Sequence, residues 1–248
     1  MAPGLTDKQT DELWPGGYRY YRDADHFPLG MDCVLLSAFV RLRRGMRVLD
    51  LGTGCGYIPL MLLGWQPELR IDAVELIPTA AGLARANAAL NGLEDRINVI
   101  EGDLRSVSGL VECGAYDLAV CNPPYFSPGS GRESSRENEK IARSAGCTVR
   151  EVCAAASYAL KNGGSFGVCW RTERMAELFA SLNGAGLEPK ILRLCANTAG
   201  SAPFLMLLQA RKQGRGGLTV MPELAVREQN GAYTREIMRM YHRDAEGG

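Results

Sequence analysis

The stretch that decides the fold reads Arg47-Val48-Leu49-Asp50-Leu51-Gly52-Thr53-Gly54-Cys55-Gly56. A short apolar run ends at glycines that alternate with other residues, and a second apolar pattern runs from Ile58 to Leu63. The segment therefore predicts a buried strand, a glycine loop and a helix. Glycine adopts positive φ and lets the backbone pass close to a ligand. Because ligands of open α/β sheets bind outside the carboxyl ends of the strands, we expect this loop to bind one.

The glycine spacing is not that of a dinucleotide loop. The pattern G-x-G-x-x-G would need glycine at Tyr57. Instead, three predicted strands, 47–51, 70–75 and 97–103, end in or near the acids Asp50, Glu75 and Asp103. An acid about 20 residues after the loop suits ribose hydroxyls. Since so many carboxylates repel phosphates, the pattern favours S-adenosylmethionine, with its amino group, ribose and adenine.

Composition limits the other possibilities. The chain has 248 residues, 46% of them hydrophobic, and a formal net charge of zero, so it can bury one substantial core and has no global field that attracts nucleic acid or membrane. We find no signal segment and no apolar run long enough to span a bilayer, and expect a cytoplasmic protein. The eight cysteines form no C-x-x-C pair and only two histidines are present, which predicts reduced, mostly buried thiols and no metal site.

Strands and helices are predicted to alternate along the chain. After a loose polar start at 1–17, we expect strands at 18–22, 47–51, 70–75, 97–101, 116–121, 164–170, 188–196 and 203–211. Helices are expected after Asp32, which is a possible helix cap, and at 57–64, 78–91, 148–160 and 172–184. Lys161 to Gly164 predict a turn. The alternation predicts an α/β fold with a doubly wound, mostly parallel sheet.

We expect one domain over residues 1–248. It comprises an N-terminal lid and helix at 1–45, a catalytic core at 46–212, and an extension at 213–248 that packs back on the core. The extension has strand-like segments at 218–221 and 223–226 and a helix at 234–242.

The strand at 116–121 leads directly into Asn122-Pro123-Pro124-Tyr125. Two prolines end the strand and stiffen the backbone after it. The side-chain oxygen of Asn122 and the carbonyl of Pro123 can both accept from one planar NH2 group, and Tyr125 offers a stacking face. Paired acceptors favour a nitrogen that becomes positive during methyl transfer, so the motif predicts methylation of an amino nitrogen.

With these motifs the core resembles the class I S-adenosylmethionine-dependent methyltransferases, and the sequence 122–125 is similar to the signature of those that methylate adenine or a glutamine amide. Residues 27–36 look like the N-terminal motif of the bacterial family that methylates N6 of the adenosine beside the anticodon of a valine tRNA. Residues 230–237 resemble its C-terminal segment, and Asn138-Glu139 and Ile141-Ala142-Arg143 fit its loop. One departure is Met31, where threonine is expected.

The resemblance implies a Rossmann-like sheet of seven strands, one of them antiparallel, and a role for each matching residue. It implies that Asp50, Gly52, Gly54 and Gly56 hold the methionine part of the cofactor, and that Glu75, with Leu76 beside it, takes the ribose. Asp103 and the backbone of Leu104 are implied for the adenine edge. Asn122, Pro123 and Tyr125 are implied for the target amine and base, with Asn122 also beside the cofactor. Asp32 either touches the methionyl end or caps its helix.

Candidate RNA contacts are basic. Arg41, Arg43, Arg44 and Arg47 form one cluster; Arg211, Lys212 and Arg215 form another; the loop from Arg132 to Arg143 mixes both signs. Each is either an RNA contact or a solvated face.

The main rival function is a glutamine-N5 methyltransferase acting on a translation release factor, since a base amine and an amide need the same acceptors. A DNA adenine methyltransferase would need a target-recognition domain to read base edges, and we find no such domain in the sequence, which disfavours this function. A catalytically idle RNA-binding partner is disfavoured by the intact Asp50, Glu75, Asp103 and Asn122.

Overall fold

The computed structural model describes residues 9–22, 29–123 and 147–243. The part of the chain that contains the glycine loop is built from β3 (Arg47–Leu51), α2 (Tyr57–Trp65), β4 (Arg70–Glu75), α3 (Pro78–Leu90), β5 (Ile97–Glu101), the 3-10 helix η1 (Leu104–Gly109) and β6 (Tyr116–Cys121). It is followed by α5 (Val149–Ala159), β7 (Leu160–Arg171), η2 (Thr172–Arg174), α6 (Met175–Gly184), β8 (Leu187–Thr198) and β9 (Pro203–Lys212). The elements predicted from 47 to 211 are therefore present.

One large sheet organises these elements. Its strand order over the described residues is β10-β8-β9-β7-β6-β3-β4-β5, and β11 also pairs with β8. Seven strands, β3 to β9, form the predicted sheet, in which β9 is antiparallel to both its neighbours and the other pairs are parallel. The described sheet has two strands more than the expected seven. These are β10 (Thr219–Val220) and β11 (Leu224–Arg227), which both pair with β8 in parallel and bring the number of strands to nine.

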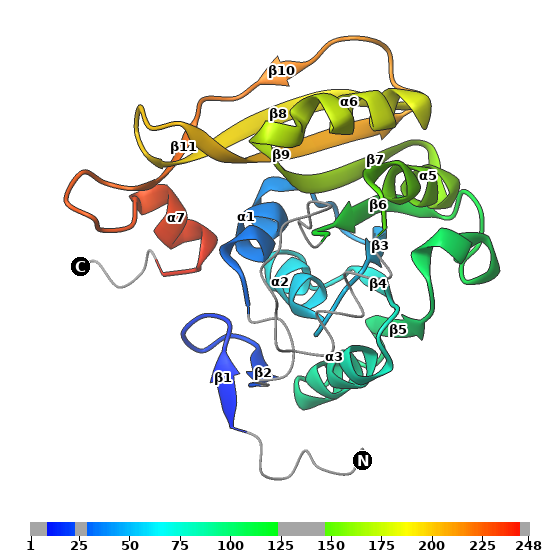
Figure 1. Ribbon diagram of the computed structural model, residues 1–248. Coiled ribbons are helices and arrows are strands. Elements are labelled where there is room, and N and C mark those ends of the chain that lie inside the picture. The colour runs from blue at the N-terminus through cyan, green and yellow to red at the C-terminus, as the bar shows by residue number, and fades with distance from the viewer. Residues whose placement is uncertain (1–8, 23–28, 124–146, 244–248) are drawn as a thin grey trace, which may run out of the picture.

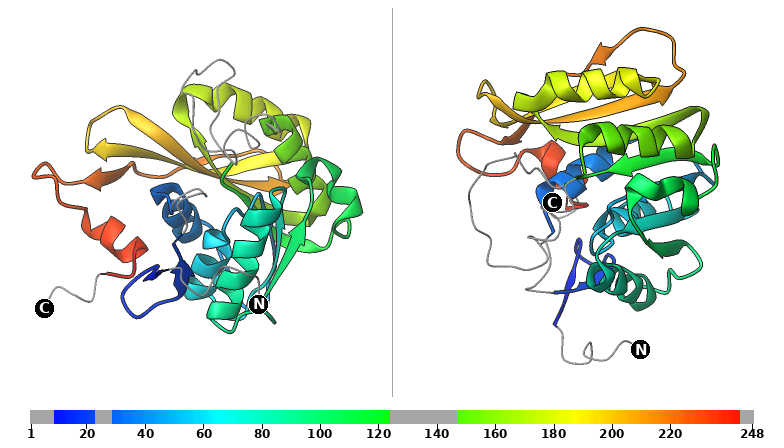
Figure 2. Two further views of the ribbon diagram at one scale, coloured as in Figure 1. Left: turned by 60° about the horizontal axis from the view of Figure 1, so that its bottom comes forward. Right: turned by 45° about the vertical axis from the view of Figure 1, so that its right-hand side comes forward.

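Helices cover both faces of the sheet, as Figures 1 and 2 show. One apolar cluster lies between the sheet and α1 (Met31–Phe39), α2, α3 and α7 (Arg235–Met240). The other lies between the sheet and η1, α5 and α6. Helix α5 starts with a capping box in which the Thr148 side chain accepts from Glu151 N and the Glu151 side chain accepts from Thr148 N. Two buried layers of this kind are what a doubly wound sheet requires.

The strand β7 corrects one local expectation. Residues 161–164, predicted as a turn, lie inside β7, where the register with β6 shifts between the pairs Tyr116–Leu160 and Leu118–Ser165. Gly163 has φ +74°, and a Cβ on Gly164 would lie 3.1 Å from the Tyr116 carbonyl oxygen. The glycine pair therefore forms an irregularity in a continuous strand, because these two glycines let the backbone bulge close to its neighbour.

The start of the chain is more ordered than we expected. Strands β1 (Thr10–Glu12) and β2 (Arg19–Tyr21) pair as an antiparallel hairpin, and Leu13 is buried. The hairpin is bound to α3 by the Asn91 side chain, which accepts from Arg19 N at 2.8 Å and donates to Arg19 O at 2.7 Å. The expectation of a loose start is wrong for residues 9–17, and residues 1–8 lie outside the described residues.

The C-terminal extension is attached to the core at several places. Besides the pairing of β10 and β11 with β8, α7 contacts α1, and the His242 ring lies 4.5 Å from Trp14 and 4.0 Å from Trp65 at the end of α2. The Arg193 side chain on β8 is nearly buried and donates two hydrogen bonds to the Glu236 carboxylate on α7. The division of the chain at 45 and 212 stays a prediction. No helix within the described residues is long and apolar enough to cross a membrane.

The Arg193–Glu236 pair should stabilise the extension. We predict that Glu236→Gln lowers the free energy of unfolding by about 1–3 kcal/mol, because the Arg193 guanidinium then keeps a buried charge without its partner. Urea denaturation at pH 7 measures this, and trypsin cleavage within residues 213–243 should become faster. The matched control is Glu228→Gln, an exposed glutamate of the same extension. Equal stability of both variants would show that the pair is only a surface contact.

Candidate active site

The glycine loop joins the end of β3 to the start of α2. Gly52, Gly54 and Gly56 all have positive φ, at +79°, +58° and +83°. The amides of Gly52 and Thr53 donate to the carbonyl of Val74 on β4, which holds the loop at the end of the neighbouring strand. A Cβ built on Gly52 or Gly54 would meet no atom of the described residues within 4 Å, whereas one on Gly56 would lie 3.2 Å from the Ala84 Cβ. The first two glycines therefore border open space, and the third permits close helix packing.

Asp50 is a buried acid directly before this loop. Its side chain is 0% exposed, and neither carboxylate oxygen has a hydrogen-bond partner within the described part of the chain. Burial raises the pKa of Asp50 to about 7, and the negative charge of Glu75 raises it further. The nearby Thr53 hydroxyl lowers the pKa in the opposite direction, although it makes no well-directed hydrogen bond to the carboxylate. A buried acceptor without a partner is unfavourable, so this site fits a ligand that supplies a cationic donor.

Glu75 connects the end of β4 to the glycine loop. The carboxylate is nearly buried and accepts from Gly54 N at 2.7 Å and from Ile77 N at 2.8 Å. Each oxygen has a second lone pair, so the carboxylate can still accept from hydroxyls. The next residue, Leu76, is a large apolar side chain with 37% exposure, which offers an apolar contact beside Glu75. Sequence reasoning found the acid but missed its bond to the loop.

Asp103 lies beyond the end of β5 and forms the N-cap of η1. It accepts from Arg105 N at 2.9 Å, and the Arg105 guanidinium also binds both carboxylate oxygens. These hydrogen bonds from Arg105 lower the pKa of Asp103, so the group is ionised at neutral pH. Leu104 follows as the first residue of η1 and is partly buried. The arginine was not singled out from the sequence, although its position two residues after the acid is a readable signal.

Asn122 directly follows β6, beside the end of β3. Its amide nitrogen donates to Cys33 Sγ at 3.2 Å, and its side-chain oxygen accepts from Cys169 Sγ at 3.0 Å. Burial raises the pKa of Cys33 to about 12, so this thiol stays protonated. Pro123 is buried, whereas Tyr125 lies outside the described residues. Two cysteines that the sequence assigned only to the core therefore orient the amide of Asn122.

Asp32 does not cap its helix. Helix α1 begins at Met31, and its N-cap is Gly30, which makes no side-chain cap hydrogen bond. Asp32 instead lies in the first turn, where a negative charge is favourable. It precedes Cys33, the residue that contacts Asn122, so α1 brings Asp32 close to the end of β6. The cap alternative is wrong, and contact with a ligand stays a prediction.

The two basic clusters found in the sequence lie at the opposite edge of the sheet. Arg47 starts β3 and pairs with Asp72, with 3.1 Å between Arg47 Nη2 and Asp72 Oδ2, and Arg44 pairs with Glu68. Lys212 ends the antiparallel strand β9 and donates to the Leu160 carbonyl at 2.8 Å. These residues are therefore separated from the carboxyl ends of β3, β4 and β6 by the length of the strands. The loop 132–143 lies outside the described residues.

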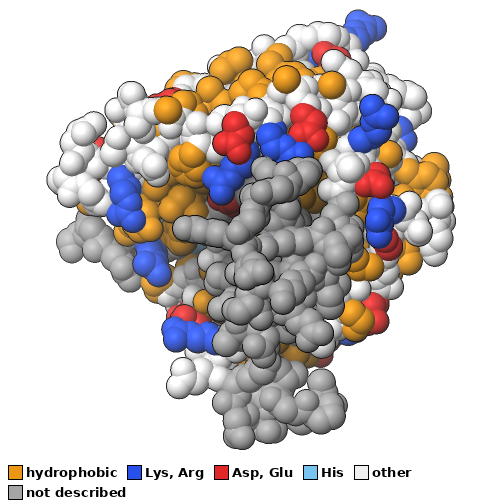
Figure 3. Space-filling view, viewed as in Figure 1, with side chains coloured by type: hydrophobic (Ala, Val, Ile, Leu, Met, Phe, Trp, Pro, Cys, Tyr) orange, Lys and Arg blue, Asp and Glu red, His pale blue; other side chains and the backbone are white. Residues whose placement is uncertain are grey.

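Other arginines lie at the edge where the acids lie. Strand β11 ends at Arg227, whose guanidinium lies 4.4 Å from the centre of the Tyr233 ring, and that ring stacks on Tyr241 with 6.1 Å between centres. Arg239 on α7 and Arg243 beyond it are also exposed. On the face shown in Figure 3, basic and acidic side chains of the described residues are interspersed. The pairing of β11 with β8 brings Arg227 to this end of the sheet, so no local signal could have found it.

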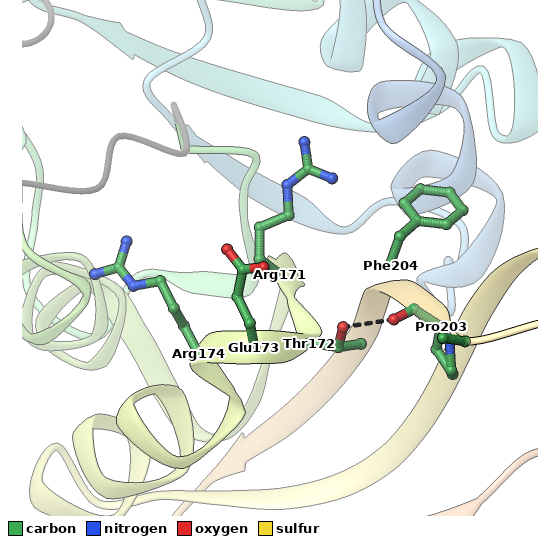
Figure 4. A pocket seen from close by; sticks show the side chains of 7 residues that line it. Arg171, Thr172, Glu173, Arg174, Pro203 and Phe204 are labelled. Atoms are coloured by element: carbon green, nitrogen blue, oxygen red, sulfur yellow. Dashed lines mark hydrogen bonds between the residues drawn. The ribbon is translucent and has the colours of Figure 1, made fainter. Parts of the chain in front are cut away.

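A pocket opens beside this row of strand ends. It has a volume of about 480 Å³ and lies where β7 ends and β9 begins, lined by residues 171–174 and 202–204 (Figure 4). The Thr172 hydroxyl donates to the Pro203 carbonyl at 2.7 Å, which ties its two sides together. Sequence reasoning did not single out any of its residues.

The comparisons with known proteins agree with this geometry. A family model described as methyltransferase small domain matches residues 32–182. The chain belongs to this family. A methyltransferase of Yersinia pestis (strain Pestoides F), named tRNA1(Val) (adenine(37)-N6)-methyltransferase, is 34% identical to this methyltransferase over 243 residues, which cover 94% of this chain and 95% of the relative. A protein of the same name from Yersinia pseudotuberculosis serotype O:1b (strain IP 31758) has the same identity and coverage.

Solved structures share the fold of this methyltransferase. A predicted O-methyltransferase of Agrobacterium tumefaciens has a TM-score of 0.71 at 21% identity, covering 86% of this chain and 96% of its own. A geranyl diphosphate methyltransferase in complex with S-adenosylmethionine has a TM-score of 0.52 at 12% identity, covering 72% and 82%. The predicted Rossmann-like methyltransferase fold and the enzyme class are confirmed.

The raised pKa of Asp50 predicts how the stability of the ligand-free methyltransferase changes with pH. A folded pKa of about 7 against an ordinary value of 3.8 means that the folded state retains a proton that the unfolded state releases. Stability that is present below pH 3.8 is therefore lost as pH rises to about 7. Relative to Asp50→Asn, the wild type should lose roughly 2–3 kcal/mol between pH 5 and pH 8.

Urea denaturation of both proteins across this range provides the measurement. Asp103→Asn is the matched control. Because the pKa of Asp103 is lowered, its titration changes the stability only below pH 3.8. The difference in free energy of unfolding between Asp103→Asn and the wild type should therefore be constant between pH 5 and 8. A constant difference for Asp50→Asn as well would contradict the assignment of a buried, proton-binding Asp50.

Proposed function

We propose that this methyltransferase transfers the methyl group of S-adenosylmethionine to the N6 amine of an adenosine in tRNA, and specifically to the adenosine beside the anticodon of a valine tRNA. The observation that carries the proposal is the position of Asn122, an amide held by two thiols, beside the buried Asp50 carboxylate, which has no hydrogen-bond partner in the described part of the chain. Asp50 pairs in register with Val120, so Asn122 lies only two residues, about 7 Å, further along the adjacent strand.

The residues at the ends of β3, β4 and β5 fit the cofactor in the order that the sequence predicts. Asp50 accepts from its amino group, and the backbone at Gly52, Gly54 and Gly56 leaves room for its methionine part. Glu75 accepts from the ribose hydroxyls with its remaining lone pairs. Leu76 and Leu104 supply apolar contacts, and Asp103 shares its oxygens between Arg105 and the adenine edge. When bound, S-adenosylmethionine supplies a methyl group on a sulfonium. Asp32 is a further candidate for the methionyl end.

Asn122 holds the amine. Its side-chain oxygen accepts one hydrogen bond from the Cys169 thiol and has a lone pair left for an amine N–H. The contact of its nitrogen with Cys33 keeps the amide from rotating. With the Pro123 carbonyl as second acceptor and Tyr125 as stacking face, the amine is oriented and its developing positive charge is stabilised.

RNA is favoured over a protein amide by two findings. The relatives that match nearly the whole chain are named as tRNA adenine methyltransferases. The arginines and stacked tyrosines of the C-terminal extension lie at the site's edge of the sheet, and such groups suit phosphates and bases. A tRNA substrate also fits a cytoplasmic location. The glutamine-N5 alternative has no observation of its own and is decided by the experiment below.

Cofactor affinity should depend on Glu75. We predict that Glu75→Gln weakens S-adenosylmethionine binding at least tenfold, because the loss of a charge-assisted hydrogen bond costs about 1.5–3 kcal/mol and the bond to Gly54 N also weakens. Calorimetric titration measures the affinity. Glu101→Gln, at the exposed end of β5, is the control. An unchanged affinity for Glu75→Gln would disprove the role of this acid.

Turnover should depend on Asn122 without a change in cofactor affinity. Asn122→Ala should keep S-adenosylmethionine binding within about twofold but lose about 100-fold in methyl transfer, because the acceptor acts chiefly on the transition state. Asn98→Ala, an amide bound to Asp72, is the control and should keep normal turnover.

Labelled methyl transfer to unfractionated tRNA from cells lacking the enzyme, and separately to release factor, identifies the substrate. Label recovered as N6-methyladenosine after nucleoside digestion supports the proposal. Label found only in the protein would establish the glutamine alternative.

A further inference from the structure

The pocket at the end of β7 and the start of β9 lies next to Asn122, which we propose holds the target amine. It lies away from the proposed cofactor site. In the sheet order β9-β7-β6-β3-β4-β5, the residues proposed for the cofactor lie at or just beyond the ends of β3, β4 and β5, and Asn122 directly follows β6. The pocket follows as the next position along the same edge, at the end of β7 and the start of β9. Groups at this position can reach the substrate beyond the target amine, but are separated from the proposed cofactor residues by β6.

Strand geometry gives the separation. Cys169 contacts Asn122, and Arg171 lies two residues further along β7, on the same face and about 7 Å onward. This distance is short enough for a nucleotide attached to the target base to reach the pocket while the target amine lies at Asn122. A more distant part of the substrate would have to pass over other strands first.

The side chains of the pocket suit a nucleobase. Figure 4 shows Arg171 and Phe204 projecting to the same side from the ends of β7 and β9, with Glu173 nearby. A phenyl ring and a guanidinium plane are the groups on which single-stranded bases stack. A carboxylate such as Glu173 accepts from the amino or imino N–H of a base, and arginine also pairs with phosphate.

The sides of the pocket are held by contacts that do not require a ligand. The Arg174 guanidinium is bound by Glu177, with 2.7 Å between Arg174 Nε and Glu177 Oε2, and lies 5.0 Å from the centre of a Trp170 ring. The Thr172–Pro203 hydrogen bond joins η2 to β9. Phe204 packs on the apolar cluster that contains α1. A preformed pocket loses less conformational entropy when a base enters it.

We propose that this pocket binds the base of a nucleotide adjacent to the target adenosine, stacked on Phe204 and contacted by Arg171 and Glu173. The inference rests on the proposed RNA substrate and adds a second base-binding position to it. The pocket thereby makes methylation depend on the neighbouring base, because binding of that base helps to place the target amine at Asn122.

The test combines protein and RNA changes. The RNA is the fluorescent anticodon stem-loop of a valine tRNA, intact or with an abasic site at either neighbour of the target adenosine, and its affinity is measured by anisotropy with S-adenosylhomocysteine present. For the wild type, one of the two abasic sites should weaken binding about tenfold, the scale of one lost base stack. For Phe204→Ala, the intact RNA should bind about tenfold more weakly, and the same abasic site should have less than a twofold further effect.

Matched variants separate this effect from misfolding and from general loss of charge. Phe204→Tyr keeps the stacking face and should keep the wild-type response, and Phe204→Leu keeps the apolar packing but should behave like Phe204→Ala. Arg44→Ala removes an arginine at the opposite edge and should leave the abasic response unchanged. S-adenosylmethionine affinity should be normal in every variant. Phe204→Tyr, Phe204→Leu and Arg44→Ala should keep the urea midpoint close to that of the wild type, whereas Phe204→Ala should lower it because its apolar packing is lost.

Two outcomes overturn the inference. One is an abasic penalty of equal size in the wild type and in Phe204→Ala; the other is no penalty at either neighbour in the wild type. If N6-methyladenosine still forms in tRNA, only the pocket assignment fails. If the stem-loop does not bind and label appears only in release factor, the proposed function fails with it.

Discussion

A buried carboxylate with no hydrogen-bond partner among the described residues constrains the whole structure. Asp50 is 0% exposed among apolar strands, and burial raises its pKa to about 7. Such a group opposes folding, so the surrounding apolar layers must offset it. Two clusters of buried side chains, one on each face of the sheet, provide this stabilisation. The unfavourable group is retained at the position where a cationic ligand group would compensate it, which is typical of a binding site.

The parallel strands place Asp50 and the other polar side chains of the site in a row. Because β3 to β7 are parallel, their carboxyl ends meet at one edge, and the order of the strands sets the order of the groups. Three acids follow one another on β3, β4 and just after β5, with Asn122 on one side of them and the pocket beyond it. The bond from Gly54 N to Glu75 shows how closely neighbouring ends are connected, since one carboxylate holds both the loop and its own strand end.

Cysteine has a positioning role in this site. Cys33 comes from α1 and Cys169 from β7, and they hold the two ends of the Asn122 amide. Burial raises the pKa of Cys33, so this thiol remains neutral and can orient a polar side chain without placing a charge near a developing cation. The helix α1 thereby contributes to the site through Cys33, and the C-terminal helix α7 supports α1 in turn.

The sequence by itself determined the elements whose signals are local. The apolar run and glycines of 47–56, the acids at 50, 75 and 103, and the prolines after Asn122 predicted the parallel core and the order of the site, because hydrophobic periodicity and backbone freedom act within a few residues. Only the tertiary structure decided what depends on distant contacts. It paired Asn122 with two cysteines, placed Arg47 and Lys212 at the far edge, and brought Arg227 to the near one. It also put Gly30 rather than Asp32 at the start of α1 and joined Arg171 to Phe204 in one pocket. These contacts depend on strand order and register, which no short stretch of sequence encodes.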